Sequence, residues 1–166
     1  MTIVTYNDLV NLREKYKESK IIFCSGSFDL LHAGHILFFE DCKKYGDVLV
    51  VGVGDDQTLR SYKGEKRPIL NEHVRIKMVD SLKCVDYCFI DCPSNVGEKI
   101  FFSPLSYIFQ RLRPDFYAVN EDGFRVSDTK EVAEKFQVKV LLLKRECPVE
   151  FDNVSTSKII ERIKRL

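Results

Sequence analysis

Hydrophobic and polar residues alternate along the chain in two distinct patterns. Short, nearly continuous apolar runs are typical of strands that are buried on both faces of a parallel sheet. Longer segments with apolar residues three or four positions apart are typical of amphipathic helices. The apolar runs predict strands at residues 20–24, 47–53, 85–90, 116–119 and 138–143. The helical pattern predicts helices within 1–19, at 36–46, shortly after 54–56, at 72–82, within 93–113, at 129–136 and at 158–166.

Strands and helices alternate throughout the chain. This order predicts an α/β fold with a doubly wound, five-stranded parallel sheet. With 166 residues, of which 45% are hydrophobic, we expect a single domain comprising residues 1–166. In that domain the helix within 1–19 packs on the core, and the segment 155–166 forms the C-terminal helix.

Single residues refine two of these helices. Asn71 is a good N-cap for the helix at 72–82. The apolar residues of that helix that are expected to face inward are Val74, Met78, Val79 and Leu82. Pro104 must start or break the helix within 93–113, because an interior proline lacks the N–H donor that a helix needs.

Composition narrows the class of partner. The 26 basic and 25 acidic residues give a net charge of +1, which does not favour a nucleic acid or an anionic membrane as the partner. No apolar run approaches the roughly 18 residues that cross a bilayer, and the N-terminus lacks the order of a signal peptide. We therefore expect a cytoplasmic protein with a small-molecule partner.

The six cysteines fit a reducing compartment. Cys84, Cys88 and Cys92 are spaced four by four, which raises the alternative of a zinc or iron–sulfur site. Such sites usually have pairs of cysteines two residues apart. These three residues instead lie across an expected helix end, a strand and a loop, so a structural role is favoured.

The segment from Cys24 to His35 concentrates the chemistry of the chain. Small residues and a carboxylate are followed by two histidines that flank Gly34 at the expected start of a helix. Backbone N–H groups at a helix start favour an anion, and glycine lets a ligand approach the backbone closely. This arrangement therefore suits a phosphate. The alternatives are ordinary histidines in a turn, or a metal site for which no third ligand is evident.

A second hydroxyl-rich helix start, Ser155-Thr156-Ser157, comes near the end of the chain. In a doubly wound sheet both helix starts can face one crevice and form two phosphate cradles. Each basic residue nearby is by itself typical of a solvated surface, but together they suggest a polyphosphate site. These residues are Lys63, Arg67, Arg75, Lys144 and Arg145.

Two motifs resemble a known superfamily. Gly26-Ser27-Phe28-Asp29 followed by His32-Ala33-Gly34-His35 is similar to the signature of the HxGH-type nucleotidyltransferases, which include cytidylyltransferases and small adenylyltransferases. The segment 154–160 resembles their C-terminal signature, so the resemblance covers about residues 20–163. The segments 63–69, 71–75 and 85–86 look most like the adenylyltransferase domain of bacterial heptose 1-phosphate enzymes. Glycerol-3-phosphate cytidylyltransferase is similar too.

The resemblance implies a Rossmann-like nucleotidyltransferase fold and attack by a substrate phosphate on the α-phosphate of a nucleoside triphosphate. It implies His32, His35 and Lys63 as catalytic residues, and no metal held by protein side chains. Magnesium would bridge the triphosphate oxygens. The nucleotide-binding residues that it implies are Gly26, Ser27, Phe28, Asp29, Gly34, Arg75, Asn120, Asp122, Arg145, Ser155 and Thr156. Small members of this superfamily are often dimers, so a homodimer is an expectation here.

Two segments depart from the family pattern and leave the substrate open. After the fourth strand, Asn120-Glu121-Asp122-Gly123 replaces the usual glycine–aspartate pair, and the segment 146–153 is longer than the turn of cytidylyltransferases. The leading hypothesis is an enzyme that makes an ADP-heptose-like product from a phosphorylated sugar. A cytidylyltransferase that makes CDP-glycerol or a related CDP-alcohol is the alternative, and a nucleotide-binding regulator without turnover is the third.

Overall fold

The computed structural model describes residues 3–92, 104–121, 126–144, 147–151 and 154–166. Its centre is a five-stranded sheet in the order β3-β2-β1-β4-β5, and every pair of neighbouring strands is parallel. The strands are β1 (Ile21–Gly26), β2 (Val48–Gly54), β3 (Tyr87–Asp91), β4 (Phe116–Asn120) and β5 (Lys139–Leu143). The chain order reverses between β1 and β4, which is the topological switch point of a doubly wound sheet.

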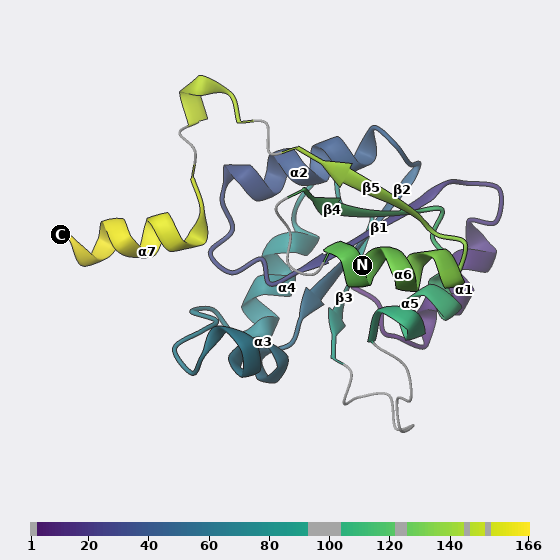
Figure 1. Cartoon of the computed structure of the whole chain (residues 1–166), viewed down its shortest axis with the longest axis horizontal. Coiled ribbons are helices and arrows are strands. Elements are labelled where there is room, and N and C mark those ends of the chain that lie inside the picture. Colours follow the sequence, from purple (N-terminus) through teal and green to yellow (C-terminus); the bar gives the residue numbers. More distant parts are fainter. Residues whose placement is uncertain (1–2, 93–103, 122–125, 145–146, 152–153) are drawn as a thin grey trace.

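Helices connect the strands and cover the sheet (Figure 1). They are α1 (Asp8–Lys15), α2 (Ala33–Lys43), α3 (Asp56–Lys63), α4 (Glu72–Asp80), α5 (Pro104–Leu112), α6 (Val126–Lys135) and α7 (Thr156–Lys164). A short 3-10 helix, η2, spans Val149–Phe151. The α/β class and the five parallel strands that the sequence predicts are confirmed.

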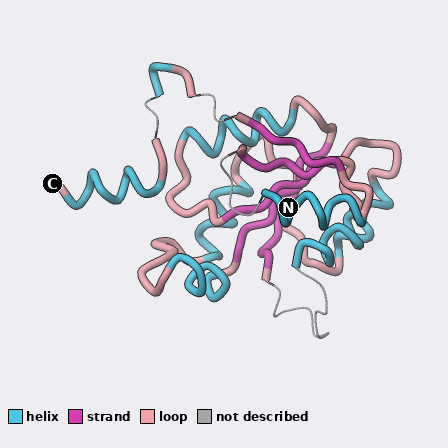
Figure 2. Tube along the Cα trace, in the orientation of Figure 1, coloured by secondary structure: helices cyan, strands magenta, loops and turns pink. Residues whose placement is uncertain are grey.

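The sheet has a hydrophobic core on each face, and Figure 2 shows the strands as a central layer between helices. On one face, α2 and α4 pack against side chains such as Ile22, Leu49 and Val51. On the other, α1, α5 and α6 pack against Phe23 and Val50 among others. Because alternate residues of a strand point to opposite faces, the continuous apolar runs supply both cores at once.

Helix boundaries follow the local chemistry. Asn71 caps α4 by accepting a hydrogen bond from the backbone N–H of Val74, as predicted. Pro104 is the first residue of α5, where its missing N–H costs nothing. The inward face of α4 was only partly predicted: Val74 is 41% exposed, whereas Arg75 and Ile76 are buried beside Val79.

The C-terminal helix α7 stands out from the rest of the fold (Figure 1). None of its residues is buried, and Ile163 is 60% exposed. The apolar stripe that predicts this helix is therefore not part of either core. In the part of the chain that the structure describes, no helix is long and apolar enough to cross a membrane.

Candidate active site

The loop that leaves β1 is shaped by a tight contact between Gly26 and Phe28. A Cβ atom on Gly26 would lie 2.9 Å from the Phe28 ring, so only glycine fits there. Phe28 itself has a φ of 44°, in the left-handed region that few non-glycine residues adopt. Its ring is buried and packs edge-on against the His35 imidazole, 5.5 Å away between centroids. The Phe28 ring thus packs against the first turn of α2.

The two histidines lie together at this helix start. His32 occupies the N-cap position of α2 and His35 lies in its first turn. Their rings stack with centroids 3.9 Å apart and planes inclined by 25°. A Cβ atom on Gly34 would lie 3.1 Å from the His32 ring, so the glycine makes room for the stacked pair. The backbone N–H groups of the first turn add a partial positive charge beside the two imidazoles.

Asp29 is a structural anchor. It is only 1% exposed, and its carboxylate accepts a hydrogen bond from Arg67 Nε at 2.9 Å. The backbone N–H groups of Ile69 and Leu70 also donate to it, at 3.0 and 3.1 Å. The carboxylate therefore holds the segment 67–70 against the loop after β1. The carboxylate is occupied by these protein groups, and contact of Asp29 with a nucleotide stays a prediction.

Arg75 is fully buried behind the same loop. Its guanidinium donates to the carbonyls of Ser27 and Gly54 at 2.6 and 2.7 Å, and to Asp56 Oδ1 at 2.8 Å. Its Nε donates to the carbonyl of Leu70 at 2.9 Å. The family resemblance implies this arginine as a nucleotide-binding residue, and that role stays a prediction. The structure makes it an internal tie between the ends of β1 and β2 and helix α4.

Lys63, the last residue of α3, contacts the loop after β1. Its Nζ donates to Ser27 Oγ at 2.7 Å. Burial of the ammonium and the nearby cations Arg67 and Arg75 lower its pKa, although the charge of Asp29 acts in the other direction. A lysine under this influence binds a phosphate anion favourably because the anion relieves the repulsion between the cations.

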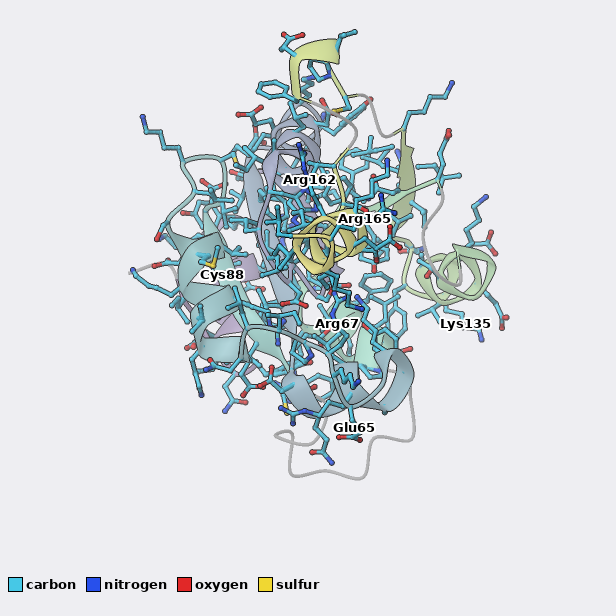
Figure 3. The ribbon with its side chains drawn as sticks, turned by 90° about the vertical axis from the view of Figure 1, so that its left-hand side faces the viewer. Glu65, Arg67, Cys88, Lys135, Arg162 and Arg165 are labelled. Atoms are coloured by element: carbon cyan, nitrogen blue, oxygen red, sulfur yellow. The ribbon has the colours of Figure 1, made fainter. Side chains whose placement is uncertain are left out.

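The start of α7 is joined to the loop after β1, 127 residues earlier in the chain. Thr156 Oγ1 donates to the carbonyl of Asp29 at 2.7 Å, and Ser155 caps the helix through the N–H of Lys158. Figure 3 looks toward α7 and shows Arg67 below it in that view, with Arg162 on the helix and Arg165 at its C-cap. This contact joins the start of α7 to the loop that precedes α2, and the shared crevice stays a prediction.

The remaining predicted residues fall in three places. Asn120 ends β4, the neighbour of β1 at the switch point. Lys144 is exposed and lines a cavity of about 320 Å³ together with Asp41 and Glu121, next to the ends of α2 and β5. Asp122 and Arg145 lie outside the described residues.

Sequence reasoning missed the acidic start of α3. Asp55 caps this helix by accepting from the N–H of Thr58, and Asp56 binds both Arg75 and Arg60. The signal was present as an aspartate three residues before a threonine, directly after a buried strand. What it did not reveal is that Arg75 would turn inward to meet Asp56.

Comparison with known proteins agrees with this arrangement. The model of the family described as "Cytidylyltransferase-like" matches residues 23–162, which include the loop after β1, the histidine pair and the start of α7. This chain belongs to the cytidylyltransferase-like family.

Relatives and a solved structure extend this likeness over most of the chain. The chain is 34% identical to "Bifunctional protein HldE" of Helicobacter acinonychis over 98% of its length, and 36% identical to that of Helicobacter pylori strain P12 over 95%. It spans 31% and 30% of the lengths of these two relatives. The crystal structure of "the lipopolysaccharide core biosynthesis protein from Thermoplasma volcanium GSS1" superposes with a TM-score of 0.62 and 26% identity, covering 78% of this chain and 98% of that one.

Proposed function

We propose that this chain is a nucleotidyltransferase that moves a nucleoside monophosphate from a nucleoside triphosphate to a small phosphorylated sugar or polyol. The observation that carries the proposal is the meeting of two helix starts at one loop, through the hydrogen bond from Thr156 to the carbonyl of Asp29, beside the stacked histidines. Identity with the HldE proteins and the motif resemblance support a heptose 1-phosphate adenylyltransferase-like activity.

In the proposed reaction, an oxygen of the acceptor phosphate attacks the α-phosphorus of the triphosphate. A new P–O bond forms there, and the bond to the oxygen that bridges to the β-phosphorus breaks. Pyrophosphate leaves with that electron pair. No covalent bond to the protein is needed, because positioning and charge stabilisation lower most of the barrier in this type of transfer.

The described side chains have distinct roles in this proposal. His32 and His35 stabilise the negative charge that develops on the transferring phosphate, and Lys63 neutralises charge next to Ser27. The N-terminus of α7, held by Thr156, receives the β- and γ-phosphates. Asp29 and Arg75 act as positioning residues, since both are buried and bind backbone groups of the loops that surround the site.

Magnesium is proposed to enter with the nucleoside triphosphate. Among the described residues, no group of three histidine, cysteine or acidic side chains could hold a metal ion. The ion would neutralise phosphate charge when bound with the triphosphate. The single-domain organisation, the cytoplasmic location and the homodimer stay predictions.

The experiment is a pyrophosphate-release assay with each of the four nucleoside triphosphates and a panel of sugar and polyol phosphates. We expect release with ATP and a heptose 1-phosphate. The family name favours one second candidate, release with CTP and glycerol 3-phosphate, as a CDP-glycerol-forming enzyme would show. If no combination releases pyrophosphate while a nucleotide still raises the melting temperature, the proposal is wrong and a nucleotide-binding regulator is favoured.

A further inference from the structure

A cavity of about 370 Å³ opens at the carboxyl ends of β2 and β3. Its lining comes from the starts of α3 and α4 and from the residue after β3, and includes Asp55, Asp56, Arg60, Glu72, His73 and Cys92. This volume is in the range of pockets that bind small molecules. None of these side chains has a role in the proposed transfer.

Two of the three carboxylates in this lining already have partners. Asp56 accepts from Arg75 Nη2 at 2.8 Å, and Glu72 Oε2 accepts from the backbone N–H of Asp56 at 2.8 Å. Asp55 differs. This residue is only 3% exposed, and its Oδ1 caps α3. Its Oδ2 is buried and accepts no hydrogen bond from any residue that the structure describes. A buried carboxylate oxygen without a donor is costly, so a donor is expected from a bound molecule.

A chain of hydrogen bonds links the cavity wall to the transfer site. Asp56 in its wall binds Arg75, which donates through its other terminal nitrogen to the carbonyl of Ser27. Ser27 in turn receives the hydrogen bond from Lys63. One guanidinium therefore separates the cavity wall from the loop at which the acceptor phosphate is proposed to react.

The charges of the cavity indicate which part of an acceptor fits. Three carboxylates line the cavity, whereas Arg60, the arginine of the lining, is paired with Asp56. This excess of acidic groups disfavours a second phosphate and favours a group that carries hydrogen-bond donors and no negative charge. The metal-binding alternative is not favoured, because no three side chains among the described residues are grouped to hold an ion. A sugar or polyol hydroxyl satisfies both conditions, since it donates one hydrogen bond to a carboxylate oxygen.

We propose that this cavity is the subsite for the polyol part of the acceptor, and that Asp55 Oδ2 accepts a hydrogen bond from one of its hydroxyl groups. This inference rests on the proposed nucleotidyl transfer and adds a specificity residue to it. The acceptor phosphate then points toward Ser27 and Lys63, and the hydroxyl-bearing carbons extend toward α3 and α4. A site built to bond a hydroxyl rejects the analogue that lacks it far more strongly than an apolar pocket rejects a smaller group.

The test combines a variant with substrate analogues. Asp55→Ser retains a good helix N-cap but removes the second oxygen. By calorimetry, the dissociation constants of a heptose 1-phosphate, glycerol 3-phosphate and their deoxy analogues are measured for the wild type and the variant. We expect the variant to bind the acceptor that the wild type prefers about 10- to 100-fold more weakly, as for a lost hydrogen bond to a charged group. ATP binding should be unchanged.

The analogues identify the bond itself. One deoxy analogue should bind the wild type more weakly by that same factor, whereas Asp55→Ser should not distinguish it from the parent sugar. Asn71→Ser, which alters the N-cap of α4 outside the cavity lining, is the matched control and should bind as the wild type does.

Two results would overturn the inference: equal acceptor affinity in Asp55→Ser and wild type, or binding of none of these acceptors by the wild type. Failure of the proposed function is recognised separately. Binding that depends on Asp55 without any pyrophosphate release would refute the transfer and retain the subsite. If pyrophosphate is released and the KM for the acceptor is the same in Asp55→Ser and the wild type, the subsite alone is refuted.

Discussion

Arg75 offers a quantitative test of how the site is held together. Its side chain is 0% exposed, and it donates hydrogen bonds to three backbone carbonyls and to the carboxylate of Asp56. Arg75→Met removes all four donations and leaves Asp56 without its buried partner. Arg75→Lys keeps the charge, but a single ammonium cannot span acceptors that lie on three different segments.

The size of the effect follows from these contacts. Breaking a largely buried ion pair by removing one partner costs about 3–5 kcal/mol, which includes the unpaired charge that is left behind. We therefore expect Arg75→Met to lower the free energy of unfolding by about 4 kcal/mol. For a chain of this size that corresponds to a fall in melting temperature of roughly 8–16 °C. Arg75→Lys should lose about half as much, because it retains one charged contact.

The assay measures the melting temperature and then the turnover well below it, where each variant is folded. Because Arg75 holds the carbonyl of Ser27, we expect Arg75→Lys to lower kcat about 10-fold even when folded. Lys77→Met on the same helix is the control, since the Lys77 side chain is 72% exposed and its pair with Asp80 is worth little. Arg75→Lys with the melting temperature and kcat of the wild type would refute the reasoning.

Three further predictions concern other parts of the fold. His35→Ala should lower turnover about 100- to 1000-fold while the melting temperature changes little, and an equally active variant would exclude its role. Burial raises the pKa of Asp91 from 3.8 to about 6. The hydrogen bond from Tyr6 opposes this shift, and the charge of Asp55 adds to it. Its neutral form is therefore favoured in the folded state, so its stabilising contribution is complete below about pH 4 and is lost as the pH rises through 6. The free energy of unfolding, measured in urea, should fall by about 1–3 kcal/mol between pH 4 and pH 7 because of this group, and Asp91→Asn should abolish that fall. The same pH dependence of stability in both proteins would contradict the assignment. Thr156→Val removes the bond to the Asp29 carbonyl and should raise the KM for the triphosphate about 10-fold without changing the KM for the acceptor; equal increases in both would argue against a phosphate role for α7.

The pattern of the central strands β1 and β2 was readable because these strands are buried on both faces. Ile21, Ile22 and Phe23 alternate between the two cores, so continuous hydrophobicity marks the strand without ambiguity. Helix α4 was harder to predict, because the inward side of a helix is inferred from its apolar residues. There a charged residue, Arg75, turns inward to bind carbonyls, and an apolar one, Val74, is left exposed. Such exchanges depend on tertiary partners that sequence spacing does not reveal.

The sequence predicted which residues belong to the candidate site but not what each of them does in the structure. The histidine pair and the two helix starts could be recognised as candidates because glycine and hydroxyl residues at helix starts are typical of phosphate-binding turns. The anchoring roles of Asp29 and Arg75 could not, since a carboxylate that binds backbone N–H groups has the same sequence signature as one that faces a ligand. The unpartnered oxygen of Asp55 is visible only when the hydrogen bonds around α3 are traced.

The most direct test of the central claim uses ATP that is radiolabelled at the α-phosphate. The proposed transfer predicts that, with a heptose 1-phosphate, the label moves into a nucleoside-diphosphate sugar while one pyrophosphate forms for each product. His35→Ala and Lys63→Met should transfer little label, whereas Lys66→Met, in the exposed loop after α3, should transfer as much as the wild type. Label that stays in ATP, or that appears only as free AMP, with every sugar and polyol phosphate would contradict the account.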